Sequence, residues 1–174
     1  CKLNSLGNLV WVKQFIGLGV ENGNSLVRDN TGNIYLAGNF TGKVDFDPGP
    51  DTSFLYSPGG NSFKYFICKL NSAGNLEWAI QQTGLSSGSI SGISVDSSGN
   101  IYATGDFKGT ADFDPGPDSL FLSTPNFIRP YAFVLKLDSN SNLVWALHYG
   151  PVISDESQRI TVDSKNNVCV SGNF

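Results

Sequence analysis

The sequence has few of the residues on which most active sites depend. His148 is the single histidine of the 174 residues, and there are three cysteines and no methionine. There is no zinc-ligand spacing, no glycine-rich phosphate loop after a strand and no amphipathic helix. We therefore interpret His148 as a partly exposed residue at a strand end, and a Ser–His or Cys–His catalytic pair has little support.

Positive charge is also scarce. Eleven lysines and arginines are outnumbered by fifteen aspartates and glutamates, so the net charge is −4 and the isoelectric point is about 4.7. This balance argues against nucleic acid as a partner, because nucleic-acid phosphates require a basic surface. No apolar run approaches the length of a membrane-spanning helix, so we expect no membrane span in this stretch.

Glycine is abundant, with 20 residues, and hydrophobic residues make up 40% of the chain. Short apolar segments separated by many turns are typical of an all-β protein. The segment DFDPGPD begins at Asp45 and again at Asp112, which sets the repeat length at 112 − 45 = 67. The segments NIYLAGNF at Asn33 and CKLNSLGNLVW at Cys1 return at the same interval. The chain is thus a tandem repeat of this length that needs no gap to hold its register.

Each repeat contains four short apolar segments joined by turns. In the first complete copy the four segments lie at residues 25–29, 34–40, 66–70 and 76–80. One turn position holds Gly32, Gly99 or Asn166, which indicates a left-handed backbone conformation. At another turn Gly74 is replaced by Ser141, which indicates a less demanding position. A glycine inside the second strand, Gly38 or Gly105, predicts close approach of another backbone or a bulge.

Four antiparallel strands joined by tight turns form one propeller blade. Strands that are apolar on both faces need a neighbouring blade on each side. Alternation predicts that Leu76, Trp78 and Ile80 share one face of their strand, as do Leu143, Trp145 and Leu147. The tryptophans at positions 11, 78 and 145 are predicted to pack between blades rather than to form a ligand platform. The predicted fold class is all-β, with β-propeller-like tandem blades of four antiparallel strands.

The repeat is longer than an ordinary propeller repeat. Such repeats have about 40–50 residues, and the excess here lies between the second and third strands, roughly at residues 41–62 and 108–129. Both stretches contain DFDPGPD. We interpret them as insertions in an ordinary blade, each forming a projecting hairpin or a long edge loop.

We assign the whole of residues 1–174 to part of one repeat domain. Residues 1–15 are the closing half of a blade, 20–83 and 87–149 are complete blades, and 155–174 are the opening half of another. Two blades and two halves do not close a ring of about four to eight blades. The chain starts within a repeat and without methionine, so we expect a longer chain with further blades. Association of several chains and an open array are the alternatives.

The pattern GNIYxxGxF, followed by K-L-[ND]-S-x-[GS]-N-L-x-W, resembles the bacterial β-propeller repeat family of the SBBP type. The variant with DFDPGP in the middle resembles tandem repeats of large secreted or surface proteins of bacteria. The resemblance covers the whole chain and implies a propeller fold and an extracellular or cell-surface location. Its third copy departs from the pattern at Leu135, Ser141, Asn166 and Cys169.

Carboxylates gather only in the DFDPGPD segments. Asp45 and Asp47 are separated by a single residue, so an extended strand would direct both toward one cation, and the Pro-Gly-Pro turn would bring Asp51 closer. Carboxylate and carbonyl oxygens are the ligands that Ca²⁺ prefers. The candidate calcium ligands are therefore Asp45, Asp47 and Asp51 with their copies Asp112, Asp114 and Asp118. The alternative is a stiff turn in which aspartate accepts hydrogen bonds from backbone N–H groups.

The cysteines do not form a disulfide framework. Cys1 and Cys68 hold the same repeat position and should lie too far apart for a disulfide, and Cys169 replaces a tyrosine. We predict that the cysteines are buried apolar residues. The residues that do not repeat gather at Arg129, Tyr131, His148 and Tyr149, and a unique site would be sought there.

Two classes of function follow. The first is a non-catalytic extracellular or cell-surface scaffold or adhesion module that contacts proteins, glycans or further copies of the repeat, since repeated surfaces suit multivalent contact. The second is the propeller domain of a polysaccharide-acting enzyme whose active site lies largely outside this stretch. A glycan-cleavage assay with His148→Ala as the control separates the two.

Overall fold

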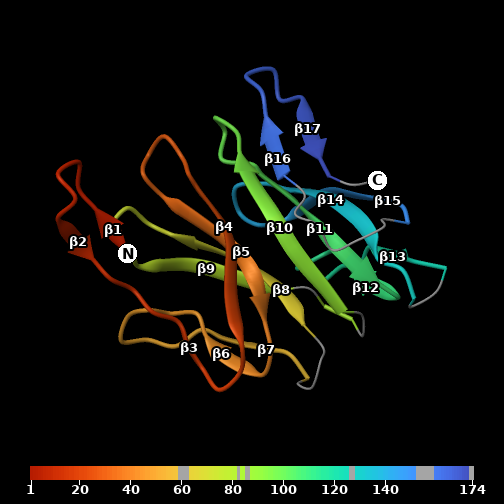
Figure 1. The fold of residues 1–174 in the computed structure, drawn as a ribbon, viewed down its shortest axis with the longest axis horizontal. Coiled ribbons are helices and arrows are strands. Elements are labelled where there is room, and N and C mark those ends of the chain that lie inside the picture. The colour runs from red at the N-terminus through yellow and green to blue at the C-terminus, as the bar shows by residue number, and fades with distance from the viewer. Residues whose placement is uncertain (59–62, 82, 85–86, 126–127, 152–158, 173–174) are drawn as a thin grey trace.

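The computed structural model describes residues 1–58, 63–81, 83–84, 87–125, 128–151 and 159–172. Within these residues every regular element is a β-strand and every strand pairing is antiparallel (Figure 1). The all-β prediction is therefore confirmed. No helix in the described part of the chain is long and apolar enough to cross a membrane.

Two four-stranded sheets form the body of the molecule. The first sheet has the order β4-β5-β8-β9, and the second has the order β10-β11-β14-β15. The same register recurs one repeat length later, because Ile34 faces Leu70 in the first sheet and Ile101 faces Leu137 in the second. The bounds are β4 Glu21–Arg28, β5 Ile34–Phe40, β8 Lys64–Leu70, β9 Leu76–Gln81, β10 Ser87–Val95, β11 Ile101–Lys108, β14 Tyr131–Leu137 and β15 Leu143–Tyr149.

Each hairpin turn of these sheets is closed by an Asp or Asn side chain. Asp96 accepts hydrogen bonds from the backbone N–H groups of Ser98 and Asn100, both at 2.9 Å. The predicted left-handed position is confirmed, with φ of +93° at Gly32, +81° at Gly99 and +64° at Asn166. The prediction of a less demanding turn at Ser141 is wrong. Its φ is +67°, so this serine adopts the conformation that Gly74 adopts in the first sheet.

Shorter hairpins lie between the second and third strands of each sheet. Between β5 and β8, β6 (Lys43–Asp45) pairs with β7 (Phe54–Tyr56) and with β3 (Ile16–Gly17) in a separate three-stranded sheet. Between β11 and β14, β12 (Thr110–Asp112) pairs with β13 (Phe121–Ser123) in a separate two-stranded sheet. Both hairpins contain DFDPGPD at the tip.

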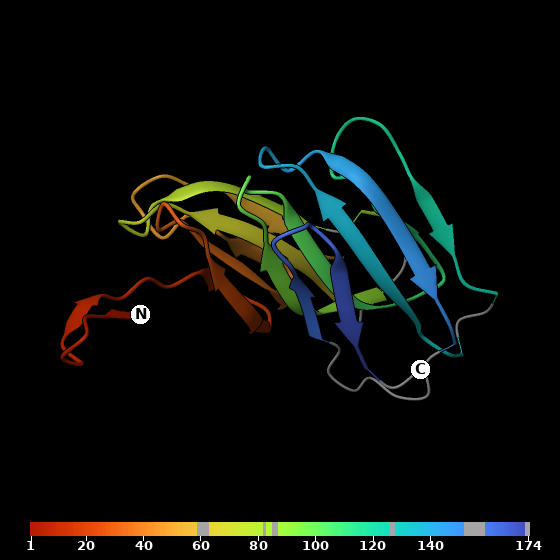
Figure 2. The same cartoon turned by 90° about the horizontal axis from the view of Figure 1, so that it is seen from above.

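The two ends of the described chain are two-stranded sheets. β1 (Lys2–Leu3) pairs with β2 (Leu9–Trp11), and β16 (Arg159–Val162) pairs with β17 (Val168–Ser171). Figure 2 shows β1–β2 at one end of the molecule, whereas β16–β17 lies against the second sheet, where β16 contacts β10 and β11.

The main core lies between the first and second sheets. Tyr35, Ala37 and Ile67 of the first sheet pack against Phe133 and Leu135 of the second, and all five are buried. Trp78 packs against this core, with its ring centroid 6.2 Å from that of Tyr35, as predicted for a residue between blades.

The predicted face of β9 is wrong at one residue. Leu76 packs on the opposite face of the first sheet from Trp78, beside Cys68 and Phe66. The reason is a register shift between Lys69 and Leu70, which places a bulge between Leu76 and Trp78 and interrupts the alternation. The second sheet has the same shift, so Leu143 faces the core while Trp145 lies against Tyr102.

The DFDPGPD hairpins are anchored to the sheets by a buried aromatic residue, while their tips, residues 49–52 and 116–119, are exposed. Phe113 is 1% exposed, and its ring centroid lies 5.2 Å from that of Phe107 and 5.0 Å from that of Phe133. It also contacts Tyr65 of the first sheet, at 6.4 Å. Phe46 is likewise buried beside Phe66. Each hairpin therefore folds back and contributes an aromatic side chain to the face of its own sheet.

Candidate functional site

A polar cleft of about 680 Å³ opens along the first strands of the sheets. β4, β10 and β16 lie side by side there, in line with Figure 1. Side-chain amides and hydroxyls supply half of the lining residues, and one carboxylate and two cations line the cleft as well. The lining residues that matter here are Asn22, Asn24, Asn39, Ser87, Ser89, Ser91, Asp106, Lys108 and Arg159.

Asn24 and Asn39, which line the cleft, take part in hydrogen bonds between the two sheets. The Ile90 N–H donates to Asn39 Oδ1 at 2.9 Å, and Asn24 Nδ2 donates to the Ile90 carbonyl at 2.7 Å. The Ile93 N–H donates to Ser25 Oγ at 3.2 Å. β10 shifts register between Ile90 and Gly92, and such a bulge removes backbone groups from the ladder. Side chains of the neighbouring sheet therefore satisfy them. We call these three bonds the inter-sheet clasp.

Glycines permit the strands beside the cleft to approach closely. A Cβ atom at Gly38 would overlap the carbonyl oxygen of Asn22, and one at Gly105 would overlap that of Ser89. The predicted close backbone approach is therefore confirmed at both positions.

The charged groups of the cleft come from the second sheet and from β16. Asp106 accepts a hydrogen bond from Ser89 Oγ, and Arg159 Nη1 donates to the Ser91 carbonyl at 3.4 Å. Lys108 also lines the cleft. This lining offers both donors and acceptors, which suits a hydroxyl-rich or amide-rich ligand. The single carboxylate is not part of an acid pair among the lining residues. Sequence reasoning missed this site, because its residues come from strands far apart in the chain.

The predicted calcium ligands lie at the tips of the short hairpins, where they close the turns. Asp45 Oδ1 accepts from the N–H groups of Asp47, at 3.0 Å, and Ser53, at 2.8 Å. Asp47 Oδ1 accepts from the Gly49 N–H at 2.6 Å. Asp51 is exposed.

The second copy repeats this pattern. Asp112 accepts from the N–H groups of Asp114, at 3.1 Å, and Leu120, at 2.9 Å, while Asp114 accepts from Gly116 at 2.7 Å. Asp118 is exposed. In the described part of the chain no three His, Cys, Asp or Glu side chains are grouped to hold a metal. These hydrogen bonds favour the turn interpretation, and calcium binding stays a prediction.

The residues that do not repeat come together only in part. The ring centroid of His148 lies 5.6 Å from that of Tyr131 and 6.0 Å from that of Phe107. His148 is exposed near the end of β15, and Tyr149 is half exposed beside it. Arg129 is exposed in the preceding loop. The arrangement is an aromatic contact at a strand end.

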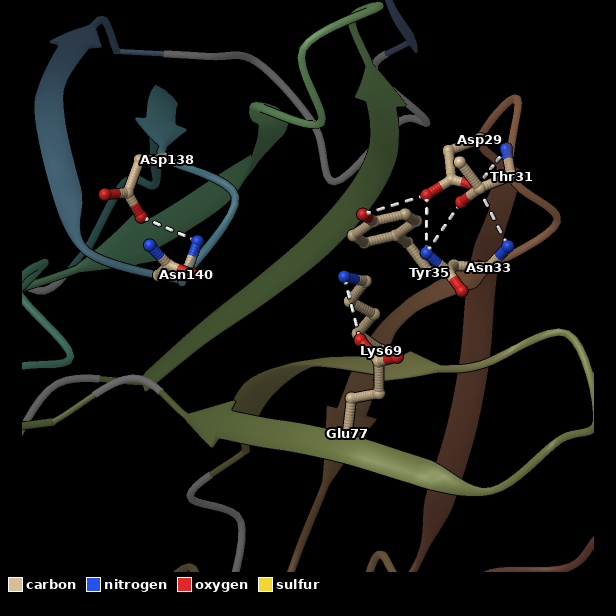
Figure 3. A network of polar contacts seen from close by, with 8 residues as sticks. All are labelled: Asp29, Thr31, Asn33, Tyr35, Lys69, Glu77, Asp138 and Asn140. Atoms are coloured by element: carbon tan, nitrogen blue, oxygen red, sulfur yellow. Dashed lines mark hydrogen bonds and ion pairs between the residues drawn. The ribbon is translucent and has the colours of Figure 1, made fainter.

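At the opposite end of the sheets, the turns form a smaller groove of about 190 Å³. Figure 3 shows Asp29 holding its turn by hydrogen bonds from Thr31 and Asn33 and, at 3.3 Å, from the Tyr35 hydroxyl. Burial raises the pKa of Asp29, but hydrogen bonds from Thr31 and Asn33 outweigh it, and the pKa lies below its usual value. Because these oxygens already have partners within the turn, we interpret the groove as structural.

Lys69 crosses the same groove. Its Nζ forms an ion pair with Glu77 at 2.8 Å and lies 5.6 Å from the Tyr35 ring centroid (Figure 3). Burial lowers the pKa of Lys69, but the interactions with Glu77 and Tyr35 outweigh burial and hold the pKa above its usual value. The amine therefore stays charged. The lysine therefore ties β8 to β9 and covers the tyrosine ring.

The three cysteines are free thiols. Cys68 is buried as predicted, and its burial raises the pKa of the thiol to about 12. The prediction of burial is wrong for Cys1 and Cys169, which are exposed. Cys169 belongs to β17 and Cys1 directly precedes β1, and no further strand covers either residue in the described part of the chain.

Comparison with known proteins supports the repeat family. Residues 77–106 match the family model described as the beta-propeller repeat. The match runs from β9 through most of β11 and so spans the junction between the two sheets. A WD repeat-containing protein of Acanthamoeba polyphaga mimivirus, itself uncharacterized, is 27% identical over 110 residues. That alignment covers 63% of this chain and only 8% of the viral protein. The all-β fold and both matches together indicate a repeat scaffold.

Proposed function

We propose that this chain is a segment of a repeat scaffold in which the first and second sheets are successive propeller-like blades. In this proposal, residues 20–83 and 87–149 are complete blades, and each DFDPGPD hairpin is an insertion between the second and third strands. Support comes from the repeated register of the two sheets and from their face-to-face packing.

The role that we infer for the scaffold is non-catalytic recognition of a glycan at the polar cleft, in an extracellular or cell-surface protein. The observation that carries this proposal is the lining of the cleft by three asparagines and three serines. Amides and hydroxyls both donate and accept hydrogen bonds, as the hydroxyls of a saccharide do. Open polar clefts bind such ligands with modest affinity, which repetition along a scaffold increases.

A panel of neutral and acidic oligosaccharides, titrated into the protein and followed by calorimetry and amide NMR, tests the proposal. We expect binding to shift signals of β4 and β10, and Asn22→Ala and Lys108→Ala to weaken it by about tenfold each, the cost of one lost hydrogen bond. Lys43→Ala is the matched control, since Lys43 lies over Phe54 on the β6–β7 hairpin. If no saccharide shifts these signals, the glycan proposal fails and a protein partner takes its place.

The same saccharides test the alternative of a polysaccharide-acting enzyme. We expect no cleavage products after prolonged incubation. Cleavage that disappears in His148→Ala would instead establish catalysis near the contact between Tyr131 and His148.

Calcium is a separate part of the proposal. If the DFDPGPD hairpins bind Ca²⁺, excess calcium raises the melting temperature of the protein relative to a chelator, because the ion binds only the folded chain. The double variant Asp45→Asn, Asp112→Asn would lose that rise. Equal melting temperatures in both conditions would leave the turn interpretation alone.

A further inference from the structure

The two cations of the polar cleft lie at different points along β10. Lys108 faces Ser87 in the pairing of β10 with β11, and Arg159 of β16 donates to the Ser91 carbonyl at 3.4 Å. Ser87 and Ser91 are 91 − 87 = 4 residues apart, which corresponds to about 13 Å along a strand. The cleft therefore presents its positive charge at two separate points.

Among the described lining residues, a single carboxylate lies between these two points. Asp106 faces Ser89 in the same strand pairing and accepts a hydrogen bond from its hydroxyl. Ser89 lies midway between Ser87 and Ser91, so the order of charges along β10 is positive, negative and positive. A carboxylate accepts hydrogen bonds from hydroxyls and repels anions. The lining therefore suits a ligand with uncharged hydroxyls in its middle and an anionic group toward each end.

The sign of the charge in the cleft is opposite to that of the whole protein. Lys108 and Arg159 outweigh Asp106, so the lining carries a formal charge of 2 − 1 = +1, whereas the chain carries −4. The Lys108 side chain is half-buried, and within the described residues no hydrogen bond or ion pair occupies its amine. Such a cation attracts an anionic group locally, although the protein as a whole repels anions.

The two cations stand where the copies of the repeat differ. The position of Lys108 holds Thr41 one repeat earlier (108 − 67 = 41), and the position of Arg159 holds Gly92 (159 − 67 = 92). Neither counterpart is charged. By contrast, the lysine that contacts the turns and tyrosine rings between the sheets recurs in every copy, as Lys2, Lys69 and Lys136. The stack of sheets therefore does not depend on the two cations of the cleft.

We propose, on the basis of the glycan recognition proposed above, that the saccharide of the polar cleft is acidic. One carboxylate binds at Lys108, another binds at Arg159, and uncharged hydroxyls lie beside Asp106. The planar guanidinium of arginine binds a carboxylate through two parallel hydrogen bonds, and lysine binds it as a point charge. Because the two cations lie apart, the ligand is an oligosaccharide with at least two acidic sugars.

A short oligosaccharide of galacturonic acid and its full methyl ester form the test pair, because they share every hydroxyl and differ only in the charge of the carboxyl groups. We expect calorimetry at low salt to show that the acid form binds about tenfold more tightly than the ester. Added salt should weaken the acid form alone. Lys108→Gln and Arg159→Gln should each weaken the acid form about fivefold and leave the ester unchanged, since glutamine keeps a donor and loses the charge.

Lys43→Gln is the matched control, because it removes one positive charge outside the cleft, on the β6–β7 hairpin over Phe54. It should leave both affinities unchanged. Arg159→Lys keeps the charge and should recover most of the preference for the acid form, even where Arg159→Gln disturbs the contact with Ser91.

The proposal is overturned if the ester binds as tightly as the acid form, or if Lys43→Gln removes the preference as effectively as the cleft variants do. It is also overturned if neutral saccharides bind and the galacturonate oligosaccharide does not, and glycan recognition survives in each of these cases. If no saccharide binds at all, glycan recognition fails together with the acidic ligand.

Discussion

At the scale of single residues, the aspartates that close the hairpin turns contribute stability that depends on pH. Burial raises the pKa of Asp96, but hydrogen bonds from Asn100, Ser98 and the Tyr102 hydroxyl outweigh it and hold the pKa below its usual value. A lowered native pKa means that the stabilisation is present above the unfolded pKa of about 3.9 and is lost as the pH falls through the native pKa. We expect Asp96→Ala to lower the free energy of unfolding by about 1–3 kcal/mol at pH 7.

Urea unfolding at pH 7 and pH 3 measures this effect. Asp96→Asn is the matched control, because Asn71 closes the corresponding turn between β8 and β9 through its own Oδ1. The asparagine variant should lose less stability at pH 7 and show a weaker dependence on pH. An alanine variant as stable as the wild type at pH 7 would contradict the role of the carboxylate.

Ser141 carries backbone strain that glycine would remove. Its φ of +67° lies in the left-handed region, where a side chain costs about 1 kcal/mol relative to glycine. We expect Ser141→Gly to raise the free energy of unfolding by about 0.5–1 kcal/mol, measured by chemical denaturation. The reverse change at the same turn of the first sheet, Gly74→Ser, should lower it, and opposite signs for the two variants are the critical observation.

At the scale of elements, the inter-sheet clasp joins β4 and β5 of the first sheet to β10 of the second through side chains. Asn39 is the acceptor for the N–H of Ile90, and Ile90 is fully buried. We expect Asn39→Ala to leave this N–H without a partner and to lower the free energy of unfolding by about 1–3 kcal/mol. Asn39→Asp should recover most of the loss, because it keeps an acceptor oxygen and aspartate is the residue at the corresponding position 106. Asn22→Ala, at an exposed neighbouring position, serves as the control in denaturant titrations.

We expect the DFDPGPD hairpins to contribute to the stability of the core through their buried aromatic residues. Phe113 is 1% exposed between rings of both sheets, while Phe121 on the same hairpin is 60% exposed. Phe113→Ala should therefore cost about 3–5 kcal/mol of stability, whereas Phe121→Ala should cost much less. Thermal or urea unfolding measures both losses. Similar losses at the two positions would contradict the burial of Phe113 as the contact that anchors this hairpin.

The sequence predicted the strands and turns well, because repetition supplies several copies of each signal. Gly32 and Asn166 share a turn position, and their common ability to adopt positive φ identifies the turn without a structure. The face of Leu76 was not predictable in the same way, since a bulge between Lys69 and Leu70 leaves no mark in the alternation of side chains. The buried position of Phe113 was missed because DFDPGPD reads as a polar turn, and only tertiary contacts show that its aromatic residue faces the sheets.

At the scale of the whole molecule, the polar cleft and the clasp were beyond sequence reasoning. Asn39 and Ile90 are 51 residues apart, and the repeated segment NIYLAGNF does not mark Asn39 as a partner of Ile90. What the repeat does predict is the stacking itself, since equivalent strands must bury equivalent faces. The exposed Cys1 and Cys169 mark the places where this rule lacks a neighbour among the described residues.

Stacked repeats contact mainly their neighbours, so the two sheets need not unfold together. Cys68 reports on this question because it is fully buried in β8, and burial raises the pKa of its thiol to about 12. In a Cys1→Ser, Cys169→Ser variant, we expect a thiol reagent at pH 8 to modify Cys68 only at the rate at which the chain unfolds globally. The core that joins both sheets through Tyr35, Ile67 and Leu135 is the physical reason, since opening one sheet exposes the other.

The measurement is the modification rate in increasing urea, compared with the loss of β-structure by circular dichroism. If the modification rate and the circular dichroism give the same free energy of unfolding, the two sheets unfold as one cooperative unit. If Cys68 reacts at a urea concentration where the circular dichroism of most strands persists, the first sheet opens alone. The main core would then couple the two sheets less strongly than its buried aromatic contacts predict. Asn39→Ala is the informative variant. Losing one bond of the inter-sheet clasp should let Cys68 react at a lower urea concentration than the one at which the circular dichroism is lost, because the contact between the sheets weakens before either sheet unfolds.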